Sequence, residues 1–140
     1  MNDCPFCAID QKKIRILVTK EHTLVVLSNP RLMPCHLLVI PKRHGEKLAE
    51  LHEQERKELW DTVMEFQEKI VAKIAPGCDI RQNYRPFLQQ SRLKVNHLHI
   101  HLLPREFEDE LYTRCMKDEK DIFKEVTKEE AERVKNILKE

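Results

Sequence analysis

Residues 97–102 read His-Leu-His-Ile-His-Leu, and this alternation constrains the fold more than any other feature of the chain. A period of two is typical of a β-strand with one buried face, because successive side chains of a strand point to opposite faces of the sheet. Leu98, Ile100 and Leu102 would then pack into the core, and the three imidazoles would stand in a row on the other face. We therefore predict a strand over Val95–Leu103.

Shorter runs rich in Val, Leu and Ile predict further strands. Asn29-Pro30 and Met33-Pro34 mark a loop between the second and the third of these runs, and Pro41 ends the third. The predicted strands before the histidine run are Ile14–Val18, Thr23–Leu27, His36–Ile40 and, as a fourth, Ile80–Asn83.

Apolar residues recur at steps of three and four from Glu46 to Ala75, which predicts one long amphipathic helix ended by Pro76-Gly77. Thr127-Lys-Glu-Glu130 has the form of a capping box and predicts a terminal helix through Leu138. Antiparallel strands with one long helix and a C-terminal helix indicate an α+β fold.

A chain of 140 residues is long enough for one domain with a substantial core. We place that domain at residues 1–105. Residues 106–140 would form a partly helical tail that packs on the domain or extends it. A net charge of +1 gives no general attraction to duplex nucleic acid or to an anionic membrane.

No apolar stretch approaches the roughly 18 residues that cross a membrane, and the first residues lack the pattern of a targeting segment. The cysteines number five, which does not suit a secreted disulfide framework. We therefore expect a cytoplasmic protein. The glycines number two, so a glycine-rich phosphate loop is not expected.

Three histidines on one strand face make a chemically versatile surface. Neutral imidazole can act as a nucleophile, a metal ligand or a proton carrier near pH 7. The alternatives are a polar outer face that happens to be histidine, or a site that only binds metal. The strict spacing of two favours a reactive site over both.

Three segments of the chain together resemble the histidine-triad (HIT) family of nucleotide hydrolases and transferases. His97-Leu-His-Ile-His-Leu-Leu-Pro-Arg105 resembles the family signature, and Cys4-Pro-Phe-Cys7-Ala-Ile resembles the opening of its zinc-containing branch. Pro34-Cys-His-Leu-Leu-Val-Ile-Pro-Lys-Arg-His44 resembles the strand and turn before the long helix of the family. The resemblance covers about residues 4 to 105 and implies a HIT-like fold.

The resemblance implies an active site made of His36, His97, His99 and His101. His99 would be the nucleophile that attacks the α-phosphorus of a nucleotide and forms a covalent nucleotidyl-histidine. His101 would donate a hydrogen bond to the phosphate. His36 would be the upstream active-site histidine, unless it is only a polar residue at the start of a strand.

A structural zinc site follows from the same resemblance, with Cys4, Cys7, His44 and His97 as ligands. Cys-x-x-Cys is also a redox motif, but such a motif should follow a strand and open a helix, and no strand precedes Cys4. The resemblance also implies a homodimer, and apolar residues beside the main stripe of the long helix, such as Trp60 and Val71, are consistent with an interface.

The chain departs from the family pattern around the phosphate. Ser28 and Asn29 stand where an acidic residue or asparagine usually holds the ribose, and Cys35 replaces a glycine before His36. The usual Gly-Gln before the triad is missing, with Leu93 in the place of the glutamine. Basic residues of this loop either replace its phosphate contacts or are solvated loop residues; these are Arg85, Arg92 and Lys94. We favour Arg92, since Lys94 would point away from the histidine face if the strand began at Leu93.

The resemblance thus implies a nucleotide hydrolase or nucleotidyl transferase. Its substrates would be nucleoside phosphoramidates, dinucleoside polyphosphates or sugar nucleotides. The alternative is a zinc-stabilised nucleotide-binding or scaffold protein with little turnover. Retention of all three histidines favours the enzyme, and loss of Gly-Gln favours the alternative.

Overall fold

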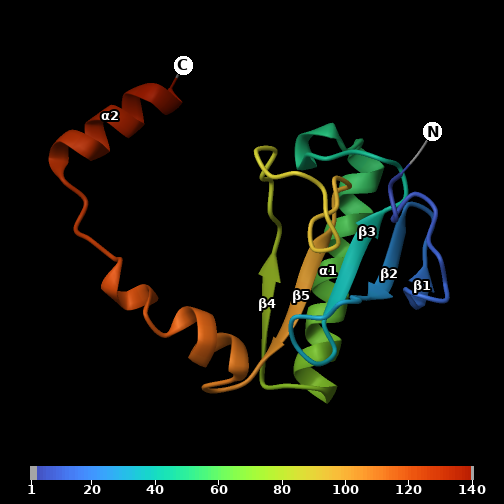
Figure 1. Cartoon of the computed structure of the whole chain (residues 1–140). Helices are drawn as coiled ribbons and strands as arrows, with labels where there is room; N and C mark the ends of the chain where they lie inside the picture. The colour runs from blue at the N-terminus through green and yellow to red at the C-terminus, as the bar shows by residue number, and fades with distance from the viewer. Residues whose placement is uncertain (1–2, 140) are drawn as a thin grey trace. The chain divides into compact units, whose positions relative to one another are not determined.

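The computed structural model describes residues 3–139, which divide into two compact units, with the boundary in the chain between Asp109 and Glu110. The first unit holds an antiparallel sheet of five strands in the order β1-β2-β3-β5-β4. The strands are β1 (Ile16–Thr19), β2 (Thr23–Leu27), β3 (Leu37–Pro41), β4 (Gly77–Arg81) and β5 (Ile100–Arg105). Helix α1 (Glu53–Lys73) runs along one face of this sheet (Figure 1).

The two faces of the sheet have different partners. Aliphatic side chains of alternate positions in β2, β3 and β5 pack against α1 and form the larger core, with Leu59, Val63 and Ile70 on the helix side. On the opposite face, Cys4 and Phe6 of the N-terminal segment pack against side chains of β2 and β3. The second face is therefore the one that the histidines share with the N-terminal segment.

The second unit contains a π-helical turn (Tyr112–Met116), a 3₁₀ turn (Glu119–Asp121) and helix α2 (Lys128–Leu138). Thr127 caps α2, because its hydroxyl oxygen accepts a hydrogen bond from the Glu130 N–H at 3.1 Å. The predicted terminal helix and the α+β class with an antiparallel sheet are both confirmed. In residues 3–139, no helix is long and apolar enough to cross a membrane.

The prediction of one helix over Glu46–Ala75 was wrong at its start. Residues Leu48–Glu50 form a 3₁₀ turn, and α1 begins only at Glu53. The Glu55 carboxylate fixes this start: it accepts the His52 N–H at 2.8 Å and a two-bond ion pair from Arg43 at 2.7 and 2.9 Å. Leu48 and Leu51 fit the apolar period because they pack on the same core from outside the helix.

The predicted strand over Val95–Leu103 is also shorter than expected, because β5 begins at Ile100. Its ladder with β3 ends at the Val39–Ile100 pair. Two residues further along β3, Pro41 has no N–H to donate, and its carbonyl accepts a hydrogen bond from the His97 ring instead. His97 and His99 therefore precede the strand, although Leu98, Ile100 and Leu102 are all buried as predicted.

Candidate active site and metal cluster

The histidine run lies at the entry to β5, on the sheet face away from α1. His101 belongs to β5, and the segment just before the strand is held by the Leu98 N–H, which donates to the Gly45 carbonyl at 2.6 Å. His97 is almost fully buried, with 1% of its surface exposed, while His99 and His101 are half-buried. The same run therefore supplies one buried imidazole and two that remain accessible.

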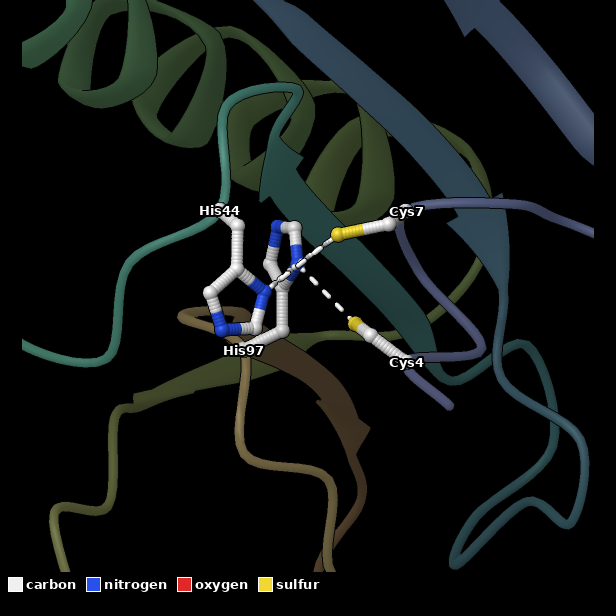
Figure 2. Close-up of side chains that lie close together, drawn as sticks. All are labelled: Cys4, Cys7, His44 and His97. Atoms are coloured by element: carbon white, nitrogen blue, oxygen red, sulfur yellow. Dashed lines mark hydrogen bonds between the residues drawn. The ribbon is translucent and has the colours of Figure 1, made fainter. Parts of the chain in front are cut away.

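Four predicted ligands come together at the buried end of the run. Cys4 and Cys7 come from the N-terminal turn, His44 from the loop after β3, and His97 from the segment before β5 (Figure 2). Their ligand atoms lie within 4.8 Å of one another. The Cys4 Sγ and the His44 Nδ1 each lie 3.2 Å from the His97 Nδ1, and the Cys7 Sγ lies 3.3 Å from the His44 Nδ1.

This cluster has the chemistry and dimensions of a tetrahedral metal site. Zn–S bonds of about 2.3 Å and Zn–N bonds of about 2.0 Å place tetrahedral ligand atoms roughly 3.3–3.8 Å apart. Two thiols and two imidazoles fill a closed coordination shell that leaves no position for substrate. A Cys₂His₂ cluster that suits zinc is therefore built from the residues predicted for it.

The His97 ring is oriented by a hydrogen bond on its far nitrogen. Its Nε2–H donates to the Pro41 carbonyl at 2.7 Å, so the Nδ1 that faces the thiols carries the lone pair. Burial also lowers the pKa of His97, which favours the neutral ring that a metal requires. The surroundings of His97 thus suit it to be a metal ligand in the cluster.

His99 has the opposite arrangement. Its Nδ1 lies 2.6 Å from the His97 carbonyl oxygen, which can only accept, so Nδ1 carries the proton and Nε2 carries the lone pair. Burial lowers the pKa of His99, which keeps the ring neutral. Phe6 packs edge-on against His99, with ring centroids 5.2 Å apart. These contacts orient the ring, and its Nε2 makes no hydrogen bond to a described residue.

His36 and His101 are joined in a chain of hydrogen bonds whose direction is fixed at its start. The Leu32 N–H donates to the His36 Nδ1 at 3.0 Å, so the proton of neutral His36 is on Nε2. That Nε2–H lies 2.9 Å from the His101 Nδ1 and donates to it. The proton of neutral His101 is therefore on Nε2. The structure thus brings His36 into contact with the triad.

Both rings of this pair are strongly biased toward the neutral form. Burial lowers the pKa of His36 to about 4, and the nearby charge of Arg81 acts in the same direction. Burial also lowers the pKa of His101 to about 3, helped by His99, His36 and Arg81. At neutral pH the chain of hydrogen bonds is therefore intact.

A cavity of about 730 Å³ opens beside His36, His99 and His101. Ser28, Asn29 and Arg92, three of the predicted substrate-binding residues, line it. The Ser28 hydroxyl donates to the Pro30 carbonyl at 2.9 Å and the Asn29 amide donates to the Lys13 carbonyl at 2.8 Å, so both side chains also brace their own loop. A volume of this size suits a nucleotide.

Lys94 lies elsewhere, in a second cavity of about 390 Å³ that also reaches His99 and His101. Its ammonium donates to the Leu88 carbonyl at 2.6 Å and to the Asn96 side chain at 2.7 Å. The expectation that Lys94 points away from the histidine face assumed a strand that begins at Leu93. No strand begins there, so this argument does not apply.

Arg81 and Phe6 belong to this site but were not predicted from the sequence. Arg81 closes β4 and is paired with His101 across the sheet, a relationship that only strand pairing reveals. Phe6 lies between the two cluster cysteines, and its ring contacts both His97 and His99. Its place within Cys-Pro-Phe-Cys was a usable signal, since a ligand pair bound beside His97 brings Phe6 to the triad.

Cys35 occupies the position where the family pattern has glycine, and its backbone explains the preference. Its φ of 62° lies in the left-handed region that favours glycine. The neighbouring peptides form a tight turn, in which the His36 N–H donates to the Met33 carbonyl at 3.2 Å. Cys35 therefore has the backbone conformation that glycine favours in this turn.

The fold and the site together define a small α+β protein in which a Cys₂His₂ cluster adjoins a row of neutral histidines. Comparison with known proteins gives the family. The chain belongs to the HIT domain family, whose sequence profile matches residues 10–108.

An uncharacterised HIT-like protein of Methanocaldococcus jannaschii is 32% identical over 105 residues, which are 73% of this chain and 78% of that protein. The fold is shared with a HIT family protein from Bacillus anthracis, with a TM-score of 0.73, 24% identity and coverage of 98% of this chain and 95% of that one. It is also shared with a zinc-bound histidine triad family protein from Mycobacterium smegmatis, with a TM-score of 0.65, 24% identity and coverage of 78% and 79%.

Proposed function

We propose that this protein is a nucleotide hydrolase or nucleotidyl transferase that acts at the α-phosphate through a covalent nucleotidyl-His99 intermediate. The observation that carries the proposal is the hydrogen bond from the His99 Nδ1–H to the His97 carbonyl. It leaves the Nε2 lone pair free, in a ring that burial keeps neutral.

The reaction would proceed in two displacements. The His99 Nε2 lone pair forms a bond to the α-phosphorus, and the bond to the leaving group breaks with its electron pair on that group. Water or another acceptor then forms a bond to the same phosphorus and loses its proton to solvent, and the P–N bond breaks to return the electron pair to His99. The rigid hydrogen bond on Nδ1 disperses the positive charge that the ring gains between these steps.

His101 would assist by directing its Nε2–H at the phosphate oxygens or at the leaving atom. The chain from the Leu32 N–H through His36 to the His101 Nδ1 supports this proton placement, because each ring accepts on Nδ1 and donates from Nε2. His36 would thus be a positioning residue that acts through His101.

Zinc is the metal that we assign to the Cys₂His₂ cluster, with a structural role. The closed set of four protein ligands leaves no place for substrate, so the metal would stabilise the fold rather than take part in the reaction. It would fasten the N-terminal turn, and with it Phe6, against the nucleophile. A structural zinc should copurify at about one ion per chain.

The second candidate is a zinc-stabilised nucleotide-binding or scaffold protein with little turnover. It is favoured by the loop before the triad, where Leu93 stands at the place of the usual glutamine. Leu93 is 83% exposed and brings no hydrogen-bonding group to the phosphate. Such a protein would bind nucleotides in the 730 Å³ cavity without forming the covalent adduct.

Trapping of the adduct distinguishes the two candidates. The zinc-loaded protein is mixed with adenosine and guanosine phosphoramidates, quenched within seconds and analysed by intact mass. The enzyme should gain the mass of one nucleotidyl group, and His99→Asn should gain none. Nucleotide binding without adduct or product formation would favour the scaffold.

We also infer a homodimer, as the resemblance implies, in the cytoplasm, as the five cysteines led us to expect. Trp60, which we expected at an interface, packs against the core instead, while Val71 and Met64 of α1 remain 45% and 55% exposed. Light scattering at micromolar concentration should give about twice the chain mass. A clean monomer would contradict the assembly.

A further inference from the structure

The permanently charged side chains that line the 730 Å³ cavity are positive. Among the described residues that line it are four permanent cations and no carboxylate; the cations are Lys13, Arg31, Arg81 and Arg92. A concave surface with charges of one sign concentrates ligands of the opposite sign. The cavity therefore suits an anionic ligand better than a neutral one.

Arg81 differs from the other three cations in its burial and position. Lys13, Arg31 and Arg92 are exposed, whereas Arg81 is half-buried at the end of β4. Exposed charges are screened by salt, and partly buried charges are screened much less. Arg81 is therefore the cation of the cavity whose charge an anion would feel most strongly.

Strand pairing places Arg81 next to the reactive histidines. In the antiparallel ladder of β4 and β5, Arg81 is directly opposite His101, so both side chains stand on the same face of the sheet. On the other side of His101, β3 presents only the apolar side chain of Leu38. Arg81 is thus the charged neighbour of His101 on its sheet face.

Within residues 3–139, Arg81 forms none of the ion pairs that fix other arginines of this fold. Arg105 is paired with Asp79 and Asp109, and Arg43 is paired with Glu55. Arg81 makes no side-chain hydrogen bond to a described residue, although its charge reaches both His36 and His101. A half-buried guanidinium without a carboxylate partner, in a cavity, has the properties of an anion-binding group.

We propose that Arg81 is a substrate-binding residue that holds the phosphate oxygens of a nucleotide beside His101, in place of the Gly-Gln loop that this chain lacks. The planar guanidinium can donate two parallel hydrogen bonds to two phosphate oxygens. The inference rests on the proposed function for the location of the phosphate. It changes the chemistry of the site, since a fixed cation replaces neutral donors and makes binding depend on ligand charge.

Binding is best measured in a background that cannot turn over. In zinc-loaded His99→Asn protein, titration calorimetry with adenosine 5′-monophosphate and with adenosine separates the contribution of the phosphate from that of the nucleoside. Adding Arg81→Met keeps most of the apolar stem and removes the charge. We expect a loss of about 10- to 100-fold in monophosphate affinity, the range for a hydrogen bond to a charged group, and less than about twofold for adenosine.

Three further variants control the interpretation. Arg81→Lys should recover part of the lost affinity, because it restores the charge but not the two-bond geometry. Arg92→Ala should lose less than Arg81→Met, because Arg92 is exposed. Arg56→Met makes the same substitution on the exposed surface of α1, outside the cavity, and should bind the monophosphate as the parent does.

The dependence on salt gives an independent readout. Monophosphate affinity of the parent should fall more steeply between 50 and 300 mM NaCl than that of Arg81→Met, because one fewer charge is screened in the variant. Equal monophosphate affinity in parent and Arg81→Met, an equal loss for adenosine, or no phosphate-dependent binding in the parent would each overturn the role of Arg81. If His99 is not the nucleophile, a separate result would show it, namely unchanged turnover in His99→Asn.

Discussion

His97 and His99 are separated by one residue, yet their imidazoles are held in opposite tautomers. The His97 Nε2–H donates to the Pro41 carbonyl and leaves Nδ1 for the thiols. The His99 Nδ1–H donates to the His97 carbonyl and leaves Nε2 for the cavity. His97 is thus suited to be a metal ligand and His99 to be a nucleophile, because a different backbone carbonyl binds a different ring nitrogen in each case.

The two ends of the run also differ in what keeps them ordered. At the His97 end the four ligand atoms lie within 4.8 Å of one another, and a metal ion would hold them together. At the His99 and His101 end, order comes from backbone groups, namely the His97 carbonyl and the Leu32 N–H. We therefore expect that a substitution at the His99 and His101 end leaves the metal cluster largely intact.

The largest effect is expected for His99→Asn. Removal of the nucleophilic nitrogen should lower turnover by at least about 10³-fold, while the zinc content and the unfolding temperature stay close to those of the parent. Steady-state kinetics with a nucleoside phosphoramidate and elemental analysis check both parts. His52→Asn, at an exposed histidine before α1, serves as the matched control. Parental turnover in His99→Asn would refute the mechanism.

Cys4→Ser tests the other end. Loss of a buried ligand should abolish stoichiometric zinc binding and lower the free energy of unfolding by roughly 3 kcal/mol, because metal-binding free energy contributes to folding. Chemical denaturation with and without chelator measures this change. Cys115→Ser removes an exposed thiol outside the cluster and should retain parental zinc and stability. A zinc-free Cys4→Ser protein with undiminished stability would show that the cluster is not structural.

Local sequence patterns predicted the helices and strands, but they did not predict how the strands pair. The alternation of residues 97–102 correctly separated buried leucine and isoleucine from the histidines. It could not show that the strand starts at Ile100, because ladder bonds depend on a partner strand, and β3 reaches Pro41 two residues beyond the Val39–Ile100 pair. Arg81 was missed for the same reason, since it pairs with His101 at a distance of 20 positions in sequence, which no local period records.

The ligand set has a different origin. Cys4, Cys7, His44 and His97 were predicted from the family resemblance, and the structure brings them together. The spacing of Cys-x-x-Cys alone fits zinc sites and redox sites equally well. The absence of a strand before Cys4 in the sequence pattern argues against a redox site, and the tertiary contact with His44 and His97 favours a metal site. That contact depends on how the loop after β3 and the segment before β5 pack. The catalytic roles of the histidines remain predictions.

A smaller effect concerns the pH dependence of stability at the reactive end. The pKa of His36 is about 4 in the folded protein, below the value of about 6.5 for an unfolded chain. Between these values the unfolded state binds a proton that the folded state does not, so stability falls as pH falls from about 6.5 toward 4 and is unaffected above that range. His36→Gln removes the contribution of this titrating group to the pH dependence of stability.

The parent should therefore lose roughly 1–2 kcal/mol more stability than His36→Gln between pH 7 and pH 5. Urea unfolding at both pH values, with zinc held constant, measures the difference, and His101 is present in both proteins. An identical loss in parent and variant would mean that His36 is not held neutral by its surroundings.

The smallest effect is expected at Cys35, in the loop that delivers His36. With φ at 62°, a residue with a Cβ carries a strain of about 1–2 kcal/mol that glycine does not. Glycine costs about 0.5–1 kcal/mol in unfolded-state entropy, so the net gain from Cys35→Gly is expected to be below about 1 kcal/mol. Cys35→Ser keeps the strain while removing the thiol, and it should match the parent. Thermal unfolding of the three zinc-loaded proteins measures the gain. Because the cluster at the His97 end does not involve this loop, zinc content should stay the same in all three; destabilisation by Cys35→Gly would show that the Cys35 side chain contributes more to the turn than its strain costs.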